Sequence, residues 1–362
     1  MRLRPYQAQL KADIYKIWQS NPRANVLAVA ATGSGKTVLF SDVIHDHKGA
    51  SVAVAHRQEL VSQISLALAR NGVRHRIIGV SSLTKICVQL HMMEIGASYF
   101  DPTAMCAVAG VDTLIRMKDD PWFRQVTLGI QDEAHHMLGN NPSNMNKWGR
   151  AATMFPNARW LGVTATPNRA DGRGLGRHAE GIMDAMVLAP AMRDLINMGY
   201  LTDYRIFAPP SDIKLEDVPV TASGEFSQEP LRKAVHASHI VGDVVAHYRR
   251  LAMGKLGVTF AVDVESATEI AQSFNDAGIP AAIVHAETPT YDRVRLLNMF
   301  KKRELLQLVN VDLFGEGFDL PAIEVVSMAR PTHSFPLTFT PWRSASSRNA
   351  LEIPTTACLV AV

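Results

Sequence analysis

The chain has 362 residues, of which 47% are hydrophobic and 20% charged, and its formal net charge is +3. This balance describes a soluble globular protein with room for two domains, and the small positive charge does not oppose a polyanionic partner. Three scattered cysteines (Cys87, Cys106 and Cys358) exclude a disulfide framework and a cysteine zinc site and fit a reducing cytoplasm. The start of the chain is no signal peptide and no apolar run reaches membrane-spanning length, so we expect no membrane partner.

Apolar strands alternate with amphipathic helices along most of the chain. In the first half the patterns predict helices at 3–19, 35–47, 57–72, 82–95 and 111–117, and strands at 25–30, 51–56, 74–80, 104–110, 126–133 and 158–166. In the second half they predict helices at 231–252, 265–278 and 290–302, and strands at 256–262, 281–286, 305–313 and 323–329. This alternation predicts an α/β fold with parallel sheets covered on both faces.

The alternation is interrupted between Asp203 and Pro230, where proline, serine and acidic residues are frequent. We therefore expect two α/β lobes that divide near residue 205. The expected organisation is a first lobe at 1–205, a linker or insertion at 206–230, a second lobe at 231–337 and a tail at 338–362.

The segment ATGSGKT (31–37) departs from the pattern GxxxxGK[ST] only in its first residue, and it stands between a strand and a helix. Such a loop turns backbone N–H groups and the helix dipole toward phosphates. Gly33 and Gly35 allow close approach of the backbone, Lys36 supplies a charge to the β- and γ-phosphates, and Thr37 offers its hydroxyl to Mg²⁺. The segment predicts an ATP site that also includes Thr32 and Ser34.

The segment QDEAHH (131–136) follows the apolar run VTLGI, so its carboxylates are expected at the carboxyl edge of the same sheet. There Asp132 would hold Mg²⁺, and Glu133 would orient and deprotonate the attacking water. An alternative interpretation takes Asp132, Glu133, His135 and His136 as a metal cluster. Neighbouring residues at a strand end point to opposite faces, which disfavours it, and His136 alone fits a structural or solvent-facing role.

Together with GVTATP (162–167), these two motifs resemble those of superfamily 2 helicases of the DEAD/DEAH-box type. The resemblance covers residues 3–337 and implies two RecA-like lobes of the P-loop NTPase class with parallel sheets, and ATP and Mg²⁺ as cofactors. Within the superfamily, RPYQ, GVTATPNR and VDLFGEGFDLPAIEVVSMARPT are most similar to RadD-like and phage-encoded DNA helicases, with roles in DNA repair or phage replication. The similarity of these segments favours DNA over RNA as the partner, with sequence-independent contacts to single strands or duplex junctions.

The resemblance assigns roles to further residues. Gln7 of RPYQ would hydrogen-bond the adenine edge, with Tyr6 or Arg4 packed on the base. His135 would couple the Mg²⁺ site to the second lobe, and Thr164 and Thr166 would couple ATP state to lobe movement. Contacts to nucleic acid are implied for Arg57, Gly110 and Thr113. In GEGFD, Gly317 and Asp319 would lie at the lobe interface, within reach of the nucleotide.

The resemblance ends after Leu337. Helicases of this kind continue with Gln-x-x-x-Gly-Arg-x-x-Arg, whose arginines reach the γ-phosphate, whereas this chain has Arg343-Ser344 and then Ser347, with Pro341 against a continuous helix. Three explanations stay open: a shifted reading frame, a natural truncation, or a variant in which Arg343 or Arg348 acts as the arginine finger. We expect an incomplete second lobe that lacks its closing helix and strand, with an exposed sheet edge and poor solubility.

Two functions follow. The first is an ATP-driven helicase or translocase, in which ATP closes the lobes on a strand and hydrolysis opens them. The second is an ATP- and DNA-binding fragment whose hydrolysis is impaired because the finger is missing. The motor subunit of a restriction-type system is a further alternative, and it would need a partner, because no nuclease motif is visible in this chain.

Overall fold

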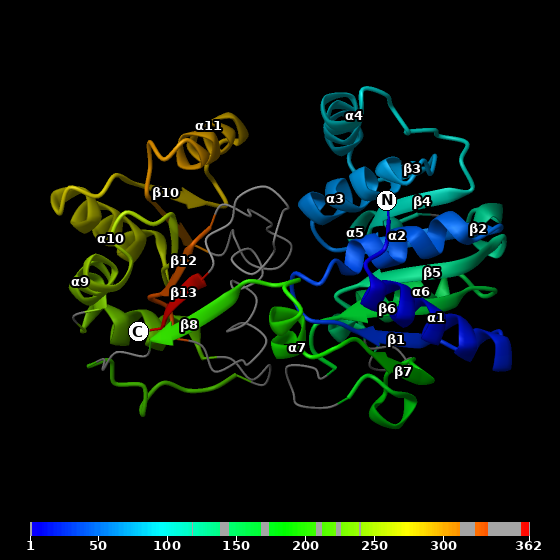
Figure 1. The fold of residues 1–362 in the computed structure, drawn as a ribbon, viewed down its shortest axis with the longest axis horizontal. Coiled ribbons are helices and arrows are strands. Elements are labelled where there is room, and N and C mark those ends of the chain that lie inside the picture. The colour runs from blue at the N-terminus through cyan, green and yellow to red at the C-terminus, as the bar shows by residue number, and fades with distance from the viewer. Residues whose placement is uncertain are drawn as a thin grey trace. The chain divides into compact units, whose positions relative to one another are not determined.

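A computed structural model describes residues 2–117, 119–137, 145–167, 174–207, 212–221, 226–238, 240–311, 323–331 and 356–361. The chain separates into two compact units, Met1–Asp194 and Leu195–Val362, each built on one parallel sheet (Figure 1). The division expected near residue 205 thus lies inside the second unit. Among the described residues, no helix is long and apolar enough to cross a membrane.

The first unit contains a seven-stranded sheet in the order β3-β4-β2-β5-β6-β1-β7. Its strands are β1 (Val26–Val29), β2 (Ala50–Ala55), β3 (Arg76–Ile78), β4 (Cys106–Gly110), β5 (Val126–Asp132), β6 (Arg159–Thr164) and β7 (Ala185–Leu188). All neighbouring strands are parallel, so their carboxyl ends share one edge of the sheet. The edge strand β7 was not expected from the sequence.

Helices cover both faces of this sheet. They are α1 (Pro5–Ser20), α2 (Lys36–Asp46), α3 (Gln58–Arg70), α4 (Ser81–Ile95), α5 (Val111–Leu114) and α6 (Lys147–Thr153), with short 3₁₀ turns η1 (Pro121–Arg124), η2 (Ala134–His136) and η4 (Arg177–Ala179). One apolar cluster joins the sheet to α1, α2 and α3, and a second joins it to α5, η1 and α6. The helix expected at 111–117 is thus shorter than predicted.

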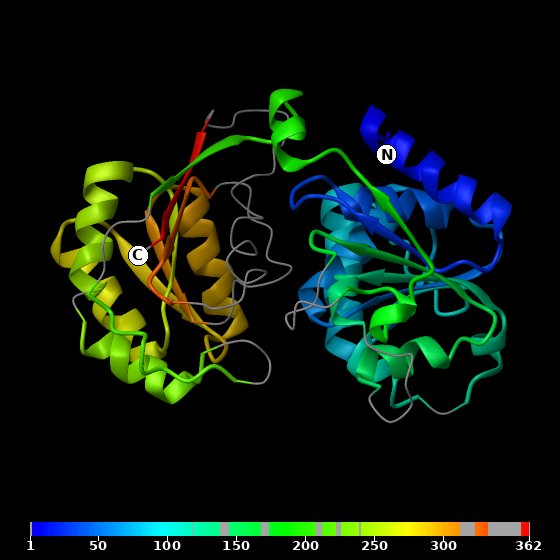
Figure 2. The ribbon, with the colours of Figure 1, turned by 90° about the horizontal axis from the view of Figure 1, so that it is seen from below.

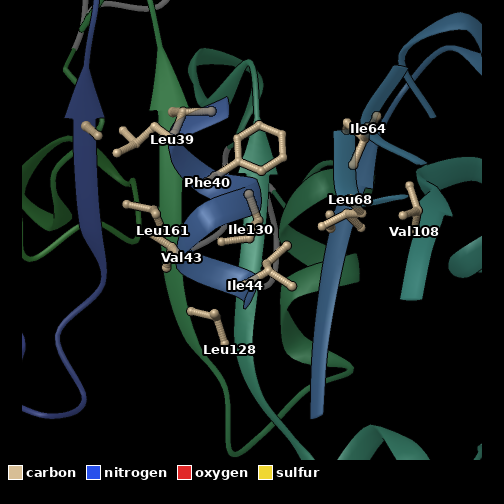
Figure 3. Packing of buried hydrophobic residues seen from close by; sticks show 14 of the residues in the cluster. Leu39, Phe40, Val43, Ile44, Ile64, Leu68, Val108, Leu128, Ile130 and Leu161 are labelled. Carbon is tan, nitrogen blue, oxygen red and sulfur yellow. The ribbon is translucent and has the colours of Figure 1, made fainter. Parts of the chain in front are cut away.

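Alternation along the strands divides side chains between the two clusters, because successive residues of a strand point to opposite faces. In β1, Val26 and Ala28 belong to the first cluster and Leu27 to the second. Figure 3 shows the first cluster, where Leu39, Phe40, Val43 and Ile44 of α2 lie against β5 and β6. This packing fixes α2, and with it the phosphate-binding loop that precedes it.

The second unit contains a six-stranded parallel sheet in the order β10-β11-β9-β12-β13-β8. Its strands are β8 (Asp203–Phe207), β9 (Gly257–Phe260), β10 (Ala281–His285), β11 (Gln307–Val311), β12 (Val325–Met328) and β13 (Thr356–Ala361), and its helices are α8 (Gln228–His236), α9 (Ile240–Ala252), α10 (Val264–Asp276) and α11 (Thr290–Lys301). Helix α7 (Met192–Asn197) spans the division between the units. Figure 2 shows α9 and α10 on one face of the sheet and α11 on the other.

Three expectations for this unit need correction. The helix expected at 231–252 is two helices, α8 and α9, and the segment 203–230 contains β8 and the start of α8. The tail also supplies a strand, because β13 pairs in parallel with β12 on one side and with β8 on the other. The expectation that the sheet lacks a strand after Met328 is therefore wrong, although its strands and helices confirm the α/β architecture with parallel sheets.

Candidate functional site

The carboxyl ends of β1, β6 and β5 bring three sequence motifs to one edge of the first sheet. The phosphate-binding loop follows β1, the segment from Asp132 follows β5, and Thr164 ends β6, which lies between the other two strands. The backbone of Ala30 donates to the carbonyl of Thr164 at 2.9 Å, so the loop and β6 are fixed to each other where they leave the sheet.

The loop at 31–37 has the conformation that phosphate binding requires. Gly33 and Gly35 have φ angles of 77° and 78°, in the left-handed region that favours glycine. A turn closes between the amide of Ser34 and the carbonyl of Ala31 at 3.1 Å. Gly35 is the N-terminal cap of α2, so the amides of the first helical turn face the loop. Lys36 is buried, and its Nζ donates to the carbonyl of Ala30 at 3.4 Å.

The start of α1 rests on this loop. Tyr6 Oη donates to the carbonyl of Ser34 at 2.6 Å, and Gln7 Nε2 donates to the same carbonyl at 2.8 Å and to that of Gly35 at 3.3 Å. Gln7 Oε1 accepts from the backbone amide of Arg4 at 2.8 Å. Both side chains are buried, and Thr32 is buried nearby in the loop. Gln7 and Tyr6 thus support the backbone of the phosphate loop, while their contact with an adenine base stays a prediction.

The acidic pair lies at the end of β5. Asp132 is 1% exposed, and its Oδ1 accepts from the amide of Glu133 at 3.0 Å. Glu133 has φ 51° and ψ 55°, a left-handed conformation that a non-glycine residue adopts only when its surroundings hold it there. The described residues contain no group of three or more metal-ligating side chains, which argues against the alternative metal cluster.

A magnesium ion does not require a cluster of three or more protein ligands. It prefers oxygen ligands, keeps several waters, and is usually held by one or two protein groups together with substrate phosphates. The Asp132 carboxylate and the half-buried Thr37 hydroxyl, in the first turn of α2, offer such oxygens at this edge of the sheet. The residues present therefore fit a magnesium ion that is bound together with ATP.

We call residues 132–136 the acidic turn. His135 connects this turn to β6. Its Nδ1 lies 3.2 Å from Thr164 Oγ1 and 3.5 Å from Glu133 Oε2. Thr164 is fully buried, and its hydroxyl also donates to the carbonyl of Thr166 at 2.9 Å and accepts from the amide of Thr166 at 3.2 Å. These contacts all lie in the first unit, and coupling of His135 to the second unit stays a prediction.

His136 has a structural environment. It is half-buried, and its ring stacks on that of Trp148 with centroids 6.0 Å apart and an interplanar angle of 7°. Its carbonyl accepts from Asn146 Nδ2 at 2.6 Å.

The residues expected to contact nucleic acid lie at the same edge of the sheet. Arg57 follows β2 and is the N-terminal cap of α3, whereas Gly110 ends β4 and Thr113 lies in α5. Strands β2 and β4 are paired with Ala55 opposite Gly110, so both segments leave the sheet side by side. The expected residues Gly317 and Asp319, and the candidate fingers Arg343 and Arg348, lie outside the described residues.

Two further residues support the site from a distance and were not predicted from the sequence. Asn146 caps α6 and bonds to the acidic turn, and an asparagine just before a helix is a recognisable cap. Gly162 lies in β6, where an added Cβ would come 2.8 Å from Cβ of Ala134. No local sequence pattern indicates the close approach of Gly162 to Ala134, because these two residues are neighbours only in the folded protein.

Both halves of the chain match known protein families. Residues 1–169 match the family described as type III restriction enzyme, res subunit, and residues 244–345 match the helicase conserved C-terminal domain. The second match continues past Leu337, where the resemblance was expected to end.

Individual proteins are also similar to this chain. A 51.5 kDa protein of Lactococcus phage (isolate 7-9) is 30% identical over 314 residues, which are 84% of this chain and 59% of the phage protein. The Saccharomyces cerevisiae protein IRC3, provisionally named an ATP-dependent helicase, is 28% identical over 92% of this chain and 47% of its own length. This chain therefore spans about half the length of these curated relatives.

Solved structures share the fold. The Pyrococcus furiosus Hef helicase domain has a TM-score of 0.53 and 15% identity, over 100% of this chain and 97% of that one. The ATP-dependent type ISP restriction-modification enzyme LlaBIII, bound to DNA, has a TM-score of 0.65 and 14% identity, over 100% of this chain and 27% of the enzyme. At these identities the likeness concerns the fold alone.

Proposed function

Because this chain belongs to the superfamily 2 helicases, we propose that it hydrolyses ATP and uses the cycle of ATP binding and hydrolysis to move along nucleic acid, which we propose is DNA. The observation that carries this proposal is the shared edge of the first sheet. The phosphate loop, the Asp132–Glu133 turn and Thr164 meet there, with Arg57 and Gly110 at the ends of neighbouring strands. One edge would then serve both ATP and the strand.

In the proposed reaction, the amides of the loop and of the first turn of α2 bind the phosphates, and the Lys36 ammonium balances their charge. Thr37 and Asp132 would hold Mg²⁺, which when bound neutralises charge on the β- and γ-phosphate oxygens. Glu133 would accept the proton of the attacking water. His135, hydrogen-bonded to Thr164 and close to the Glu133 carboxylate, would keep that carboxylate oriented.

The strand would bind at the ends of β2 and β4, through Arg57, Gly110 and Thr113. Contacts of this kind reach phosphates and carry no base information, so binding should be independent of sequence and should weaken with added salt. Gly317 and Asp319 of the second unit would complete the nucleotide site. Cysteine usage supports a cytoplasmic location.

Turnover also depends on whether an arginine reaches the γ-phosphate, which in comparable enzymes is worth about 10³–10⁵ in rate. Arg343 and Arg348 are the candidates for this role, and if neither fills it the chain is a fragment with impaired hydrolysis. Arg343→Ala and Arg348→Ala separate the two: the finger hypothesis requires one of them to lower phosphate release, whereas the impaired fragment hydrolyses slowly with or without either arginine.

A second candidate function is the motor subunit of a restriction-type system. The family match over residues 1–169 favours it, since that family is described as a restriction-enzyme subunit. Such a subunit would require a nuclease partner. Cleavage of DNA only after addition of cell extract that supplies this partner would support it over an independent translocase.

The direct test of the ATP site is Lys36→Ala. Loss of the buried ammonium should abolish measurable binding of a fluorescent ATP analogue and stop phosphate release. Lys48→Ala is the matched control, because it removes an exposed lysine just beyond α2. Unchanged ATP affinity in the Lys36 variant would show that the phosphate loop is wrongly assigned.

The partner is tested by phosphate release with single-stranded DNA, duplex DNA or RNA of the same sequence. We expect DNA to stimulate hydrolysis and the stimulation to decrease as salt is raised. Equal stimulation by RNA would reject DNA as the preferred strand. An absence of hydrolysis under all conditions would reject the motor function.

A further inference from the structure

The beginning of α6 contacts three separate segments of the first unit that carry predicted site residues. Asn146, Lys147 and Trp148 stand in a row there, and each reaches a different segment: the acidic turn after β5, α5, and the end of β2. We call these three residues and His136 the α6 junction. None of them belongs to the ATP or strand-contacting sets described above.

Asn146 ties α6 to the acidic turn with both ends of its amide. Its Oδ1 accepts from the amides of Trp148 and Gly149, each at 3.1 Å, which caps the helix. Its Nδ2 donates to the carbonyl of His136 at 2.6 Å. The position of His136 is therefore set by the start of α6.

Trp148 connects the same turn to β2. Its buried ring stacks on His136, and the ring of His56 lies edge-on to both, with centroids 5.9 Å from Trp148 and 5.4 Å from His136. His56 directly precedes Arg57, so these ring contacts connect the segment that carries Arg57 to His136.

Lys147 makes the third connection. Its Nζ lies 3.0 Å from both carboxylate oxygens of Asp112 in α5, next to Thr113. Helices α5 and α6 also pack against each other. Both segments expected to contact the strand are thus attached to the α6 junction, one through an ion pair and one through ring contacts.

The acidic turn transmits the position of His136 to Glu133. The amide of His136 donates to the carbonyl of Glu133 at 3.1 Å, and the ring of His135 lies 4.2 Å from that of His136. Glu133 is in a left-handed conformation that is unfavourable for a non-glycine residue, so it depends on such outside contacts. A small displacement of the turn would change where its carboxylate points.

We propose that the α6 junction couples occupancy of the strand-contacting segments to the placement of Glu133, and so makes ATP hydrolysis depend on nucleic acid. The inference rests on the proposed function, because it concerns how that ATPase responds to its strand. Asn146, Lys147, Trp148 and His136 are positioning residues: they reach neither ATP nor the strand in this scheme and act through Glu133.

Asn146→Asp gives the sharpest test. Aspartate keeps the oxygen that caps α6, but it cannot donate to the His136 carbonyl and repels it. Asn157→Asp is the matched control, because Asn157 Nδ2 makes the same kind of bond, at 2.7 Å, to the carbonyl of Arg124. We expect stimulation of kcat by DNA to fall about tenfold in the Asn146 variant, with a much smaller loss of basal kcat and with the KM for ATP and DNA affinity unchanged.

His136→Ala should lose stimulation in the same way, and His136→Phe, which preserves ring stacking, should restore much of it. Normal stimulation in the Asn146 and His136→Ala variants would overturn the inference. Equal losses of basal and stimulated hydrolysis would also overturn it, because they would indicate general support of Glu133. Failure of the proposed function is distinct, since the unmodified protein itself would then show no stimulation.

Discussion

Gly35 meets two separate requirements at the start of α2. Its φ of +78° lies in the left-handed region, and an added Cβ would come 2.5 Å from Gln7 Nε2. That nitrogen donates to the carbonyls of Ser34 and Gly35, so its place cannot change without loss of both bonds. The glycine of the phosphate loop therefore also makes room for the residue that holds the loop.

Gly35→Ala should lower the free energy of unfolding by roughly 1–2 kcal/mol for the backbone alone, and further because the Gln7 amide is displaced. Gly72→Ala is the control, since Gly72 has a φ of +74° but no atom within 4 Å of an added Cβ. Thermal unfolding of both variants, with and without ATP, measures their stability and their ATP binding. Equal destabilisation of the two variants, with ATP binding intact in each, would show that contact with Gln7 is unimportant.

Between α3, β3 and α4, two buried histidines share one serine hydroxyl. His75 Nδ1 lies 2.9 Å from the carbonyl of Val73, so it carries the proton, and Nε2 accepts from Ser65 at 2.7 Å. His91 Nδ1 accepts from the amide of Tyr99 at 3.3 Å, so its Nε2 donates to Ser65 at 3.0 Å. All four hydrogen bonds of the two rings can form only while both rings are neutral, because a protonated ring has no nitrogen left to accept.

These elements should therefore loosen in acid. Burial lowers the pKa of His75 from 6.5 to about 4, and burial also lowers the pKa of His91. Because the unfolded chain binds the proton first, the free energy of unfolding should fall as pH drops from 6.5 toward 4, by on the order of 3 kcal/mol for His75. Urea unfolding across this range measures the slope.

His75→Gln should flatten that slope, whereas His178→Gln, at an exposed position, should leave it unchanged. A free energy of unfolding that stays constant between pH 6.5 and 4.5 in the unmodified protein would contradict the neutral network. So would a His75 variant that keeps the full slope.

At the scale of elements, sequence patterns located the core strands and the motifs that follow them, because in each case chemistry and strand are contiguous in the chain. Patterns failed at a local helix break and at contacts between segments that are distant in the sequence. The period of 231–252 is continuous, yet the helix breaks after His236, and the Ser238 hydroxyl donates to the Val235 carbonyl at 2.7 Å. The α6 junction was beyond prediction for a different reason, since its partners are distant in sequence.

At the scale of the whole molecule, each unit depends on strands that the sequence pattern does not reveal. In the first unit β7 extends the sheet beyond β1. In the second, β13 pairs with β12 from Val325 opposite Cys358 and with β8 from Asp203 opposite Thr356. Among the described residues, β13 is the only strand that pairs with β8. The last part of the chain therefore holds in place the strand that opens the second unit.

Deletion of residues 356–362 should release β8 and expose an edge of β12. Parallel strands without a partner lose their ladder hydrogen bonds, each worth about 1 kcal/mol, and invite aggregation. Hydrogen exchange should show the amides of Asp203–Phe207 becoming unprotected, while those of β11, which pairs with β9 and β10, stay protected as an internal control. Continued protection of β8 after the deletion would mean that β13 does not hold it, and that the tail is dispensable to this sheet.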